Sequence, residues 1–250
     1  MNKMTFLIIL ILFLYSVEFF LSYRRNIPGD RKKHLLTNFL MVMVSSVSVR
    51  AVIYFIVFFE IDIYSFNTLR LPENMHFLYL IILDFFIYIQ HVLSHRWNWF
   101  WAFHKVHHAD HFLDTSSGVR FHPGEILISY FYKIGLVILL GIPKDIFLIY
   151  ELMLSSLALF NHSNIRIPKV VDKYLRLVIV TPSFHFVHHS KENHEMNSHF
   201  GNTLSIWDRL FKTYRKDSLD NENQDFGLKD VDIADSESLR KMLLFPLSRD

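Results

Sequence analysis

The sequence contains no cysteine, so disulfide bonds and thiolate ligands to a metal are both excluded. Its formal net charge is only +2, and the basic residues form no stripe that would suit a nucleic-acid backbone. The sequence also lacks a glycine-rich dinucleotide-binding motif and a haem-attachment motif. Any metal bound by this chain must therefore be held by nitrogen and oxygen atoms.

What the sequence does contain is long apolar runs, and hydrophobic residues make up 51% of its 250 positions. Residues 4–23, 38–60 and 75–95 are each long enough to cross a hydrocarbon layer of about 30 Å. Two shorter runs, 126–143 and 146–160, are separated by little more than "GIPKD" and predict a helical hairpin. We expect the first run to be retained as an anchor, because no small-residue cleavage site follows it.

The loops between the runs predict an orientation. Residues 24–34 carry five Lys or Arg, whereas residues 60–74 carry only Arg70. Because basic loops stay in the cytoplasm, the first loop is expected there, and the third run then returns the chain to the same side. The polar tail, residues 215–250, is expected to form a cytoplasmic cap.

Histidine is concentrated in one part of the chain, since thirteen of the fifteen histidines lie between His91 and His199. In "HVLSH" two histidines have the spacing i, i+4, and in "HKVHH" and "HFVHH" three have the spacing i, i+3, i+4. On a helix these spacings project the imidazoles to one side. The eight residues are His91, His95, His104, His107, His108, His185, His188 and His189.

These imidazoles suit iron, copper, nickel or zinc, and eight nitrogens exceed what one ion accepts, so two metals are expected. The competing interpretation is a set of interfacial histidines among aromatic residues. It would leave many buried polar rings without a common partner. For Trp97, Trp99 and Trp101, by contrast, we expect a place in an interfacial aromatic belt.

The three boxes resemble those of the fatty acid hydroxylase/sterol desaturase superfamily, which are integral membrane non-haem di-iron oxygenases. The segments "LDFFIYIQHVLSHR", "VRFHPGE", "FNHSN" and "GNTLSIWDRLFKTY" are also similar to the family pattern, over residues 84–214. The resemblance implies that the eight histidines ligate two irons, joined by His162 from "FNHSN". It leaves open whether His122 ligates. His199 is open too, because it stands where the family often has Asn.

Three carboxylates are candidates for orienting the ligating rings, because a metal-bound imidazole usually donates its other N–H to such a group. Asp84 lies seven residues before His91, which places both on one face of a helix. A carboxylate in an apolar helix is costly without a partner of this kind. Glu125 and Glu195 lie near the boxes and could act in the same way.

The sequence thus predicts an all-α, integral membrane helical bundle of about three spanning helices plus a hairpin, with a cytoplasmic-side histidine-rich cap that holds a dimetal site. It is expected to be one domain over residues 1–250. Residues 1–83 would form the anchor helices, 84–214 the histidine-box catalytic region and 215–250 the polar cap. The resemblance implies a cofactor of two Fe, which Zn could replace in a purified sample.

The activity implied by the resemblance is O2-dependent hydroxylation of an unactivated C–H bond in a lipid: an acyl chain, a sterol-like ring, an ether lipid or a carotenoid. A separate electron-transfer partner would supply the electrons. Desaturation of the same substrates at the same site remains an alternative. Two other classes are a membrane metal-binding or transport protein and a zinc-dependent membrane hydrolase, although no His-Glu-x-x-His motif occurs.

Overall fold

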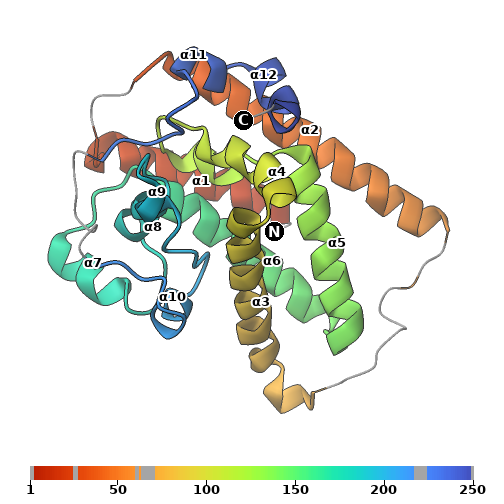
Figure 1. Cartoon of the computed structure of the whole chain (residues 1–250). Helices are drawn as coiled ribbons and strands as arrows, with labels where there is room; N and C mark the ends of the chain where they lie inside the picture. The colour runs from red at the N-terminus through yellow and green to blue at the C-terminus, as the bar shows by residue number, and fades with distance from the viewer. Residues whose placement is uncertain (1–2, 25–27, 60–61, 63–70, 217–223, 249–250) are drawn as a thin grey trace.

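A computed structural model describes residues 3–24, 28–59, 62, 71–216 and 224–248. Regular secondary structure in these residues is entirely helical, and β-structure is confined to isolated bridges such as the one between Ser22 and Ile165. Figure 1 shows long helices that extend away from a group of short helices and loops. The prediction of an all-α chain is confirmed.

Five long helices form the bundle. They are α1 (Lys3–Leu21), α2 (Arg31–Phe58), α3 (Phe77–Arg96), α5 (Pro123–Leu140) and α6 (Lys144–His162). Local chemistry sets their ends: the side chain of Asp30 caps α2 by accepting from the backbone N–H of Lys32 at 2.9 Å. Gly141, with φ of 62°, ends α5 in the left-handed conformation, and α6 begins just after Pro143. The connection between α5 and α6 is therefore as short as the predicted hairpin requires, but α5 packs mainly against α2 and α6 packs against α3, so the two helices do not pair closely along their length.

Three helices are long and apolar enough to cross a membrane: Arg31–Val57 of α2, all of α3, and all of α5. The apolar part of α1, Thr5–Leu21, is shorter. The expected number of three is therefore confirmed within the described residues, with α2 and α3 where the second and third runs predict them and α5 as the remaining helix. The shorter run 126–143 reaches this length because α5 begins at Pro123, three residues before it. The loop at 60–74, used to predict orientation, lies mostly outside the described residues.

Apart from η1 (Glu73–Met75), which precedes α3, most of the short helices gather toward the end of α3 where the first histidine box lies (Figure 1). They are α4 (Asn98–His108), η2 (Thr115–Val119), α7 (Lys169–Leu175), α8 (Pro182–His188), α9 (Asn193–Met196), α10 (Ile206–Leu210), α11 (Ile233–Ser236), α12 (Leu239–Leu244) and η3 (Phe245–Leu247). A rigid helical scaffold thus supports a compact group of turns and loops.

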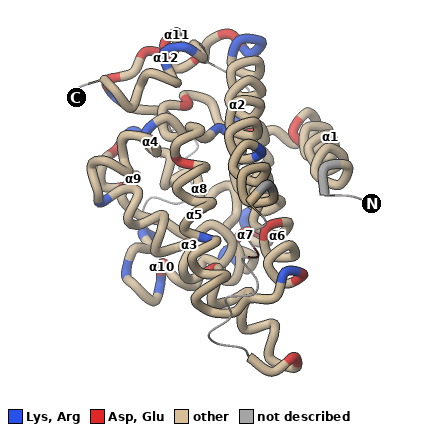
Figure 2. Tube along the Cα trace, turned by 90° about the vertical axis from the view of Figure 1, so that its right-hand side faces the viewer, with Lys and Arg blue, Asp and Glu red and all other residues tan. Residues whose placement is uncertain are grey.

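Apolar packing ties these parts together. Leu83, Val137 and Tyr150 are buried in a cluster shared by α3, α5 and α6. A second cluster joins α2 and α4 to the C-terminal segment, where Met242 is only 1% exposed. Burying one such side chain contributes about 1.5–3 kcal/mol. The C-terminal segment is charged on its outside, next to the basic first turn of α2 (Figure 2). Its inner face, however, belongs to the core.

Candidate metal centre

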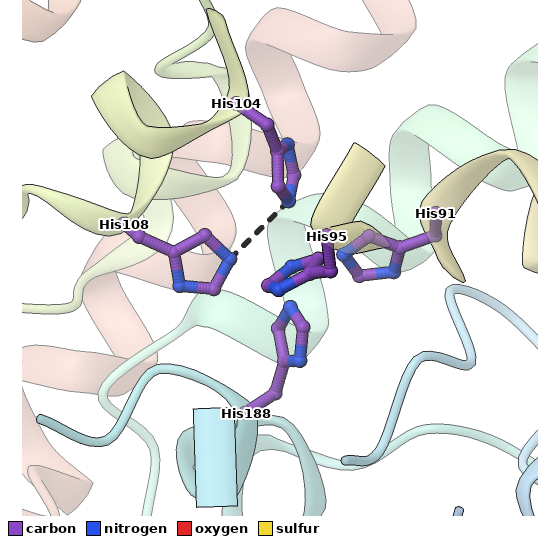
Figure 3. A group of neighbouring side chains, drawn as sticks. All are labelled: His91, His95, His104, His108 and His188. Carbon is purple, nitrogen blue, oxygen red and sulfur yellow. Dashed lines mark hydrogen bonds between the residues drawn. The ribbon is translucent and has the colours of Figure 1, made fainter. Parts of the chain in front are cut away.

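Five imidazoles from three helices meet at one point, and Figure 3 shows their rings directed toward a common centre. They are His91 and His95 of α3, His104 and His108 of α4, and His188 of α8. One nitrogen from each lies within 4.8 Å of the others. We call these five residues the first histidine group.

Four more imidazoles form the second histidine group: His107, His162, His185 and His189. The Nε2 atom of His162 is 3.0 Å from Nε2 of His107, 3.0 Å from that of His185 and 3.1 Å from that of His189. The two groups are neighbours, since the rings of His108 and His189 stack with centroids 4.5 Å apart. All nine histidines predicted as ligands therefore lie in these two groups.

The repeated triplet has a geometric explanation. Residues four apart lie on the same helix face, whereas a residue three apart is turned partly away. In α4, His104 and His108 accordingly face the first group and His107 faces the second. At α8 the division is reversed, because His185 and His189 join the second group and His188 joins the first. Each triplet thus serves both groups at once.

Hydrogen bonds fix the tautomer of three rings in the first group. His91 donates through Nδ1 to the carbonyl of Phe200 at 2.7 Å, and His188 does so to the carbonyl of Ser198 at 2.8 Å. His104 donates through Nδ1 to Oε1 of Glu125 at 2.6 Å. A carbonyl can only accept, so Nε2 of His91 and of His188 must carry a lone pair. Glu125 favours the same tautomer in His104.

The second group is fixed in the same way. His107 donates to the carbonyl of Arg120 at 3.1 Å, and His162 donates to the carbonyl of Ala158 at 2.7 Å. Their Nε2 atoms, only 3.0 Å apart, therefore present lone pairs to each other. Two facing lone pairs repel unless a cation lies between them. Neutral imidazole nitrogens suit iron, copper or zinc, so the donor set fits a metal in each group.

Electrostatics keep the rings in the metal-binding form. Burial lowers the pKa of His188 well below its usual value, and the neighbouring His91 lowers it further. The pKa of His189 falls for the same reason, first through burial and then through His107. Because a metal binds the neutral ring, these shifts favour coordination at neutral pH.

Two histidines that the sequence left open lie outside both groups. His122 uses both nitrogens: Nδ1 accepts from the N–H of Gly124 at 2.9 Å and Nε2 donates to the carbonyl of Leu243 at 3.2 Å. The ring of His199 packs on Phe184 with centroids 4.2 Å apart, and its Nε2 contacts the backbone of Arg215. The structure thus gives both rings other partners.

The three candidate carboxylates differ in position. Glu125 reaches His104, as expected. Asp84 does not orient His91, whose Nδ1 goes to Phe200; instead Asp84 accepts from Trp207 at 2.7 Å and from Tyr150 at 3.3 Å. Helix periodicity could not reveal these donors, which come from distant parts of the chain.

Glu195 lies in the short helix α9, just before the loop that leads toward Phe200. Its Oε2 accepts from Gln224 at 2.9 Å. Its backbone carbonyl accepts a hydrogen bond from the hydroxyl of Ser198. The backbone carbonyl of Ser198 in turn accepts a hydrogen bond from the ring Nδ1–H of His188. The connection between Glu195 and the first group therefore runs through the loop backbone.

Arg120 is a supporting residue that the sequence reasoning missed. Its guanidinium is buried and donates to Oδ1 of Asn38 and to the carbonyl of Ser236, both at 2.7 Å, while its own carbonyl holds His107. It thereby joins α2, the C-terminal segment and the second histidine group. The position of Arg120 in the motif "VRFHPGE", which resembles the family pattern, could have identified it from the sequence.

Trp101 has contacts that the sequence reasoning missed. Trp97 and Trp99 are 48% and 55% exposed, as suits an interfacial belt. The ring of Trp101, in contrast, packs against His95 with centroids 5.0 Å apart and against His108 at 5.5 Å. It therefore forms part of the wall of the first histidine group.

Fold and site together define a helical chain with apolar, membrane-length helices and two adjacent groups of buried imidazoles able to hold metal ions. The family model for fatty acid hydroxylases matches residues 76–213, more than half of the chain. The chain belongs to this family.

Curated relatives agree. The chain is 34% identical to ornithine lipid hydroxylase OlsE of Rhizobium tropici over 54% of its own length and 40% of that protein. It is 27% identical to alkylglycerol monooxygenase of Caenorhabditis elegans over 55% of its length and 26% of the relative. The human alkylglycerol monooxygenase is also 27% identical, over 58% of this chain and 31% of the human protein. The chain thus spans less than half the length of these relatives. No solved structure matches it.

Proposed function

We propose that this chain is a membrane-bound, non-haem di-iron oxygenase that uses O2 to hydroxylate an unactivated C–H bond of a lipid. The observation that carries the proposal is the pair of adjacent histidine groups, buried and with several tautomers fixed so that lone pairs point inward. The names of the relatives, an ornithine lipid hydroxylase and alkylglycerol monooxygenases, support a lipid substrate.

In this proposal the first histidine group holds one iron and the second holds the other. A pair of irons, when bound, supplies the electrons that O2 needs and the oxidising power to attack a C–H bond. The chain contributes position and exclusion of water. Glu125 fixes the ring of His104, the carbonyls of Phe200, Ser198 and Arg120 fix three others, and burial keeps solvent from the rings.

Placement relative to the membrane supports a lipid substrate as well. The first group begins at His91 and His95, in the last turns of the apolar helix α3. A lipid could therefore keep its head group at the interface while its chain reaches the site. We infer that this end of α3 is cytoplasmic, because residues 24–34 are strongly basic.

Desaturation at the same site is the nearest alternative, and the choice depends on how the substrate lies. A metal transporter is disfavoured, because transport would need polar ligands along a path across the bilayer. The nine histidines instead gather at one end of α3.

The test is lipid mass spectrometry of membranes that contain the protein, under ¹⁸O2, with His188→Ala as the inactive control. Hydroxylation predicts a lipid that gains one labelled oxygen atom. Loss of two hydrogens without label would show desaturation instead. An unchanged lipid profile, from protein that carries its iron, would contradict both forms of the proposal.

A further inference from the structure

A cleft of about 1210 Å³ lies beside the first histidine group, between α4, α9 and the C-terminal segment. His95 and Trp101 form part of its wall, together with Leu228, Leu244 and Phe245 of the C-terminal segment. Much of its lining comes from the C-terminal segment, between Leu228 and Ser248. We call it the cationic cleft.

Basic side chains outnumber acidic ones by three among the residues that line the cationic cleft, or by two when Glu192, the partner of Lys229, is included. Its basic side chains are Lys105, Lys191, Lys229, Arg240 and Lys241, and its acidic ones are Asp230 and Asp235. Two of the cations form ion pairs, Lys229 with Glu192 at 3.2 Å and Lys241 with Asp235. Arg240 and Lys241 are exposed at the rim. A surface of this kind attracts an acidic partner and speeds its association.

Trp101 connects the cationic cleft to the first histidine group. It lines the cleft, and its ring centroid lies 5.0, 5.5 and 6.2 Å from those of His95, His108 and His104. A single aromatic side chain thus contacts three of the five imidazoles of that group. Because the indole ring touches the candidate iron ligands, an electron on the indole would need to cross only a van der Waals contact to reach them.

The cleft wall is closed to a substrate chain. The Nε2 atoms of His91, His95 and His188, which face the centre of the first group, are fully buried. Of the five imidazoles in the first group, His95 alone is among the residues that line the cleft, beside Trp101. A lipid chain would have to pass between packed rings to reach the centre, whereas an electron needs only their contact.

We propose that the cationic cleft is the docking face of an acidic one-electron carrier protein, and that Trp101 conducts its electrons to the first histidine group. This rests on the proposed oxygenase function, in which RH, O2, two electrons and two protons give ROH and H2O. The carrier must dock and deliver one electron twice in each turnover. The cleft offers it charge attraction at the rim and an aromatic contact at the base.

The docking arm uses the full chain in detergent or nanodiscs and, as the probe, an oxidised, acidic [2Fe–2S] ferredoxin. Binding is expected at low salt and is expected to weaken at high salt. Arg240→Glu combined with Lys241→Glu should weaken it by about tenfold or more. Reversal of two exposed lysines on α7, Lys169→Glu with Lys173→Glu, is the matched control and should leave it unchanged.

Two results overturn the docking proposal. One is ferredoxin binding that is absent, or unaffected by the cleft reversal. The other is equal binding of a basic carrier such as cytochrome c. If the cleft reversal spares ferredoxin binding but abolishes lipid oxidation driven by a chemical reductant, the cleft holds a lipid head group, and the docking proposal is wrong.

The second arm measures the rate at which pre-reduced ferredoxin reduces the iron-loaded protein. Trp101→Leu should slow this step severalfold, Trp101→Phe should retain most of it, and both should keep their iron and their rate of reduction by dithionite. An unchanged rate in Trp101→Leu would refute the role of Trp101. If dithionite cannot reduce the iron bound to the wild-type protein, the oxygenase function is refuted. The binding measurements would still test the docking proposal on their own.

Discussion

The Nε2 atoms of His107 and His162 lie 3.0 Å apart, although each ring donates a hydrogen bond from its Nδ1–H to a backbone carbonyl. Both nitrogens therefore offer a lone pair to the same small space. The fold holds this unfavourable arrangement in place through packing around it. A cation between the rings would convert the repulsion into coordination, as the proposed metal centre requires.

Removal of metal should therefore destabilise the protein, because an ion that binds only the folded state adds to its stability. At an ion concentration 100 times the dissociation constant, the gain is about 2.7 kcal/mol per site. We expect a clear fall in the thermal midpoint after chelation and recovery when ferrous iron is restored. A midpoint that chelation leaves unchanged would show that the histidine groups bind nothing important for the fold.

Glu125→Gln should weaken metal binding without unfolding the chain. The carboxylate accepts the Nδ1 proton of His104 at 2.6 Å, and loss of such a partner typically costs about 10–100-fold in metal affinity. Metal affinity can be measured by competition with a chelator. The matched control is Glu192→Gln, on the exposed surface. Equal metal affinity in the two variants would show that Glu125 does not support metal binding.

Arg120→Lys should be destabilising although it keeps the charge. One guanidinium bridges Asn38 and the carbonyl of Ser236, and a lysine ammonium lacks this planar fork. Losing hydrogen bonds from a buried charge should lower the free energy of unfolding by about 2–4 kcal/mol. Arg240→Lys, at an exposed position, serves as the control. Equal thermal midpoints in the two variants would contradict this role.

His199→Asn should leave the iron content unchanged. His199 has φ of 55°, a left-handed conformation that Asn adopts more readily than most side chains, and its ring packs on Phe184 away from both groups. This backbone demand gives a physical reason for the Asn that the family often has at this position. Loss of one iron per chain in the variant would make His199 a ligand after all.

Much of the site was predictable because the spacing of its histidines along the sequence matches the periodicity of a helix. The triplets of α4 and α8 place imidazoles on one side of a helix whatever surrounds them, and "FNHSN" identified His162 by resemblance. The division of each triplet between two groups was not predictable, because it depends on how α8 packs beside α4. The backbone carbonyls of Phe200 and Ser198, which fix the tautomers of His91 and His188, could not be predicted, because every residue has a carbonyl whatever its side chain.

Two other differences have equally local causes. The start of α5 at Pro123 is marked by the preceding His122 cap, a polar signal that apolar-run length ignores. The C-terminal segment looks polar on average, yet Val231 and Met242 are buried against α2 and α4. Average polarity over a short segment conceals one apolar face, and only the tertiary contact reveals it.

The most direct test of the account is the iron stoichiometry of anaerobically purified, iron-loaded protein and of one alanine variant from each histidine group. The wild-type chain should hold two irons, and both His188→Ala and His185→Ala should lose at least one, whereas exposed His194→Ala should keep both. Two irons retained in His188→Ala and in His185→Ala, or a wild-type chain that binds none, would contradict the di-iron centre.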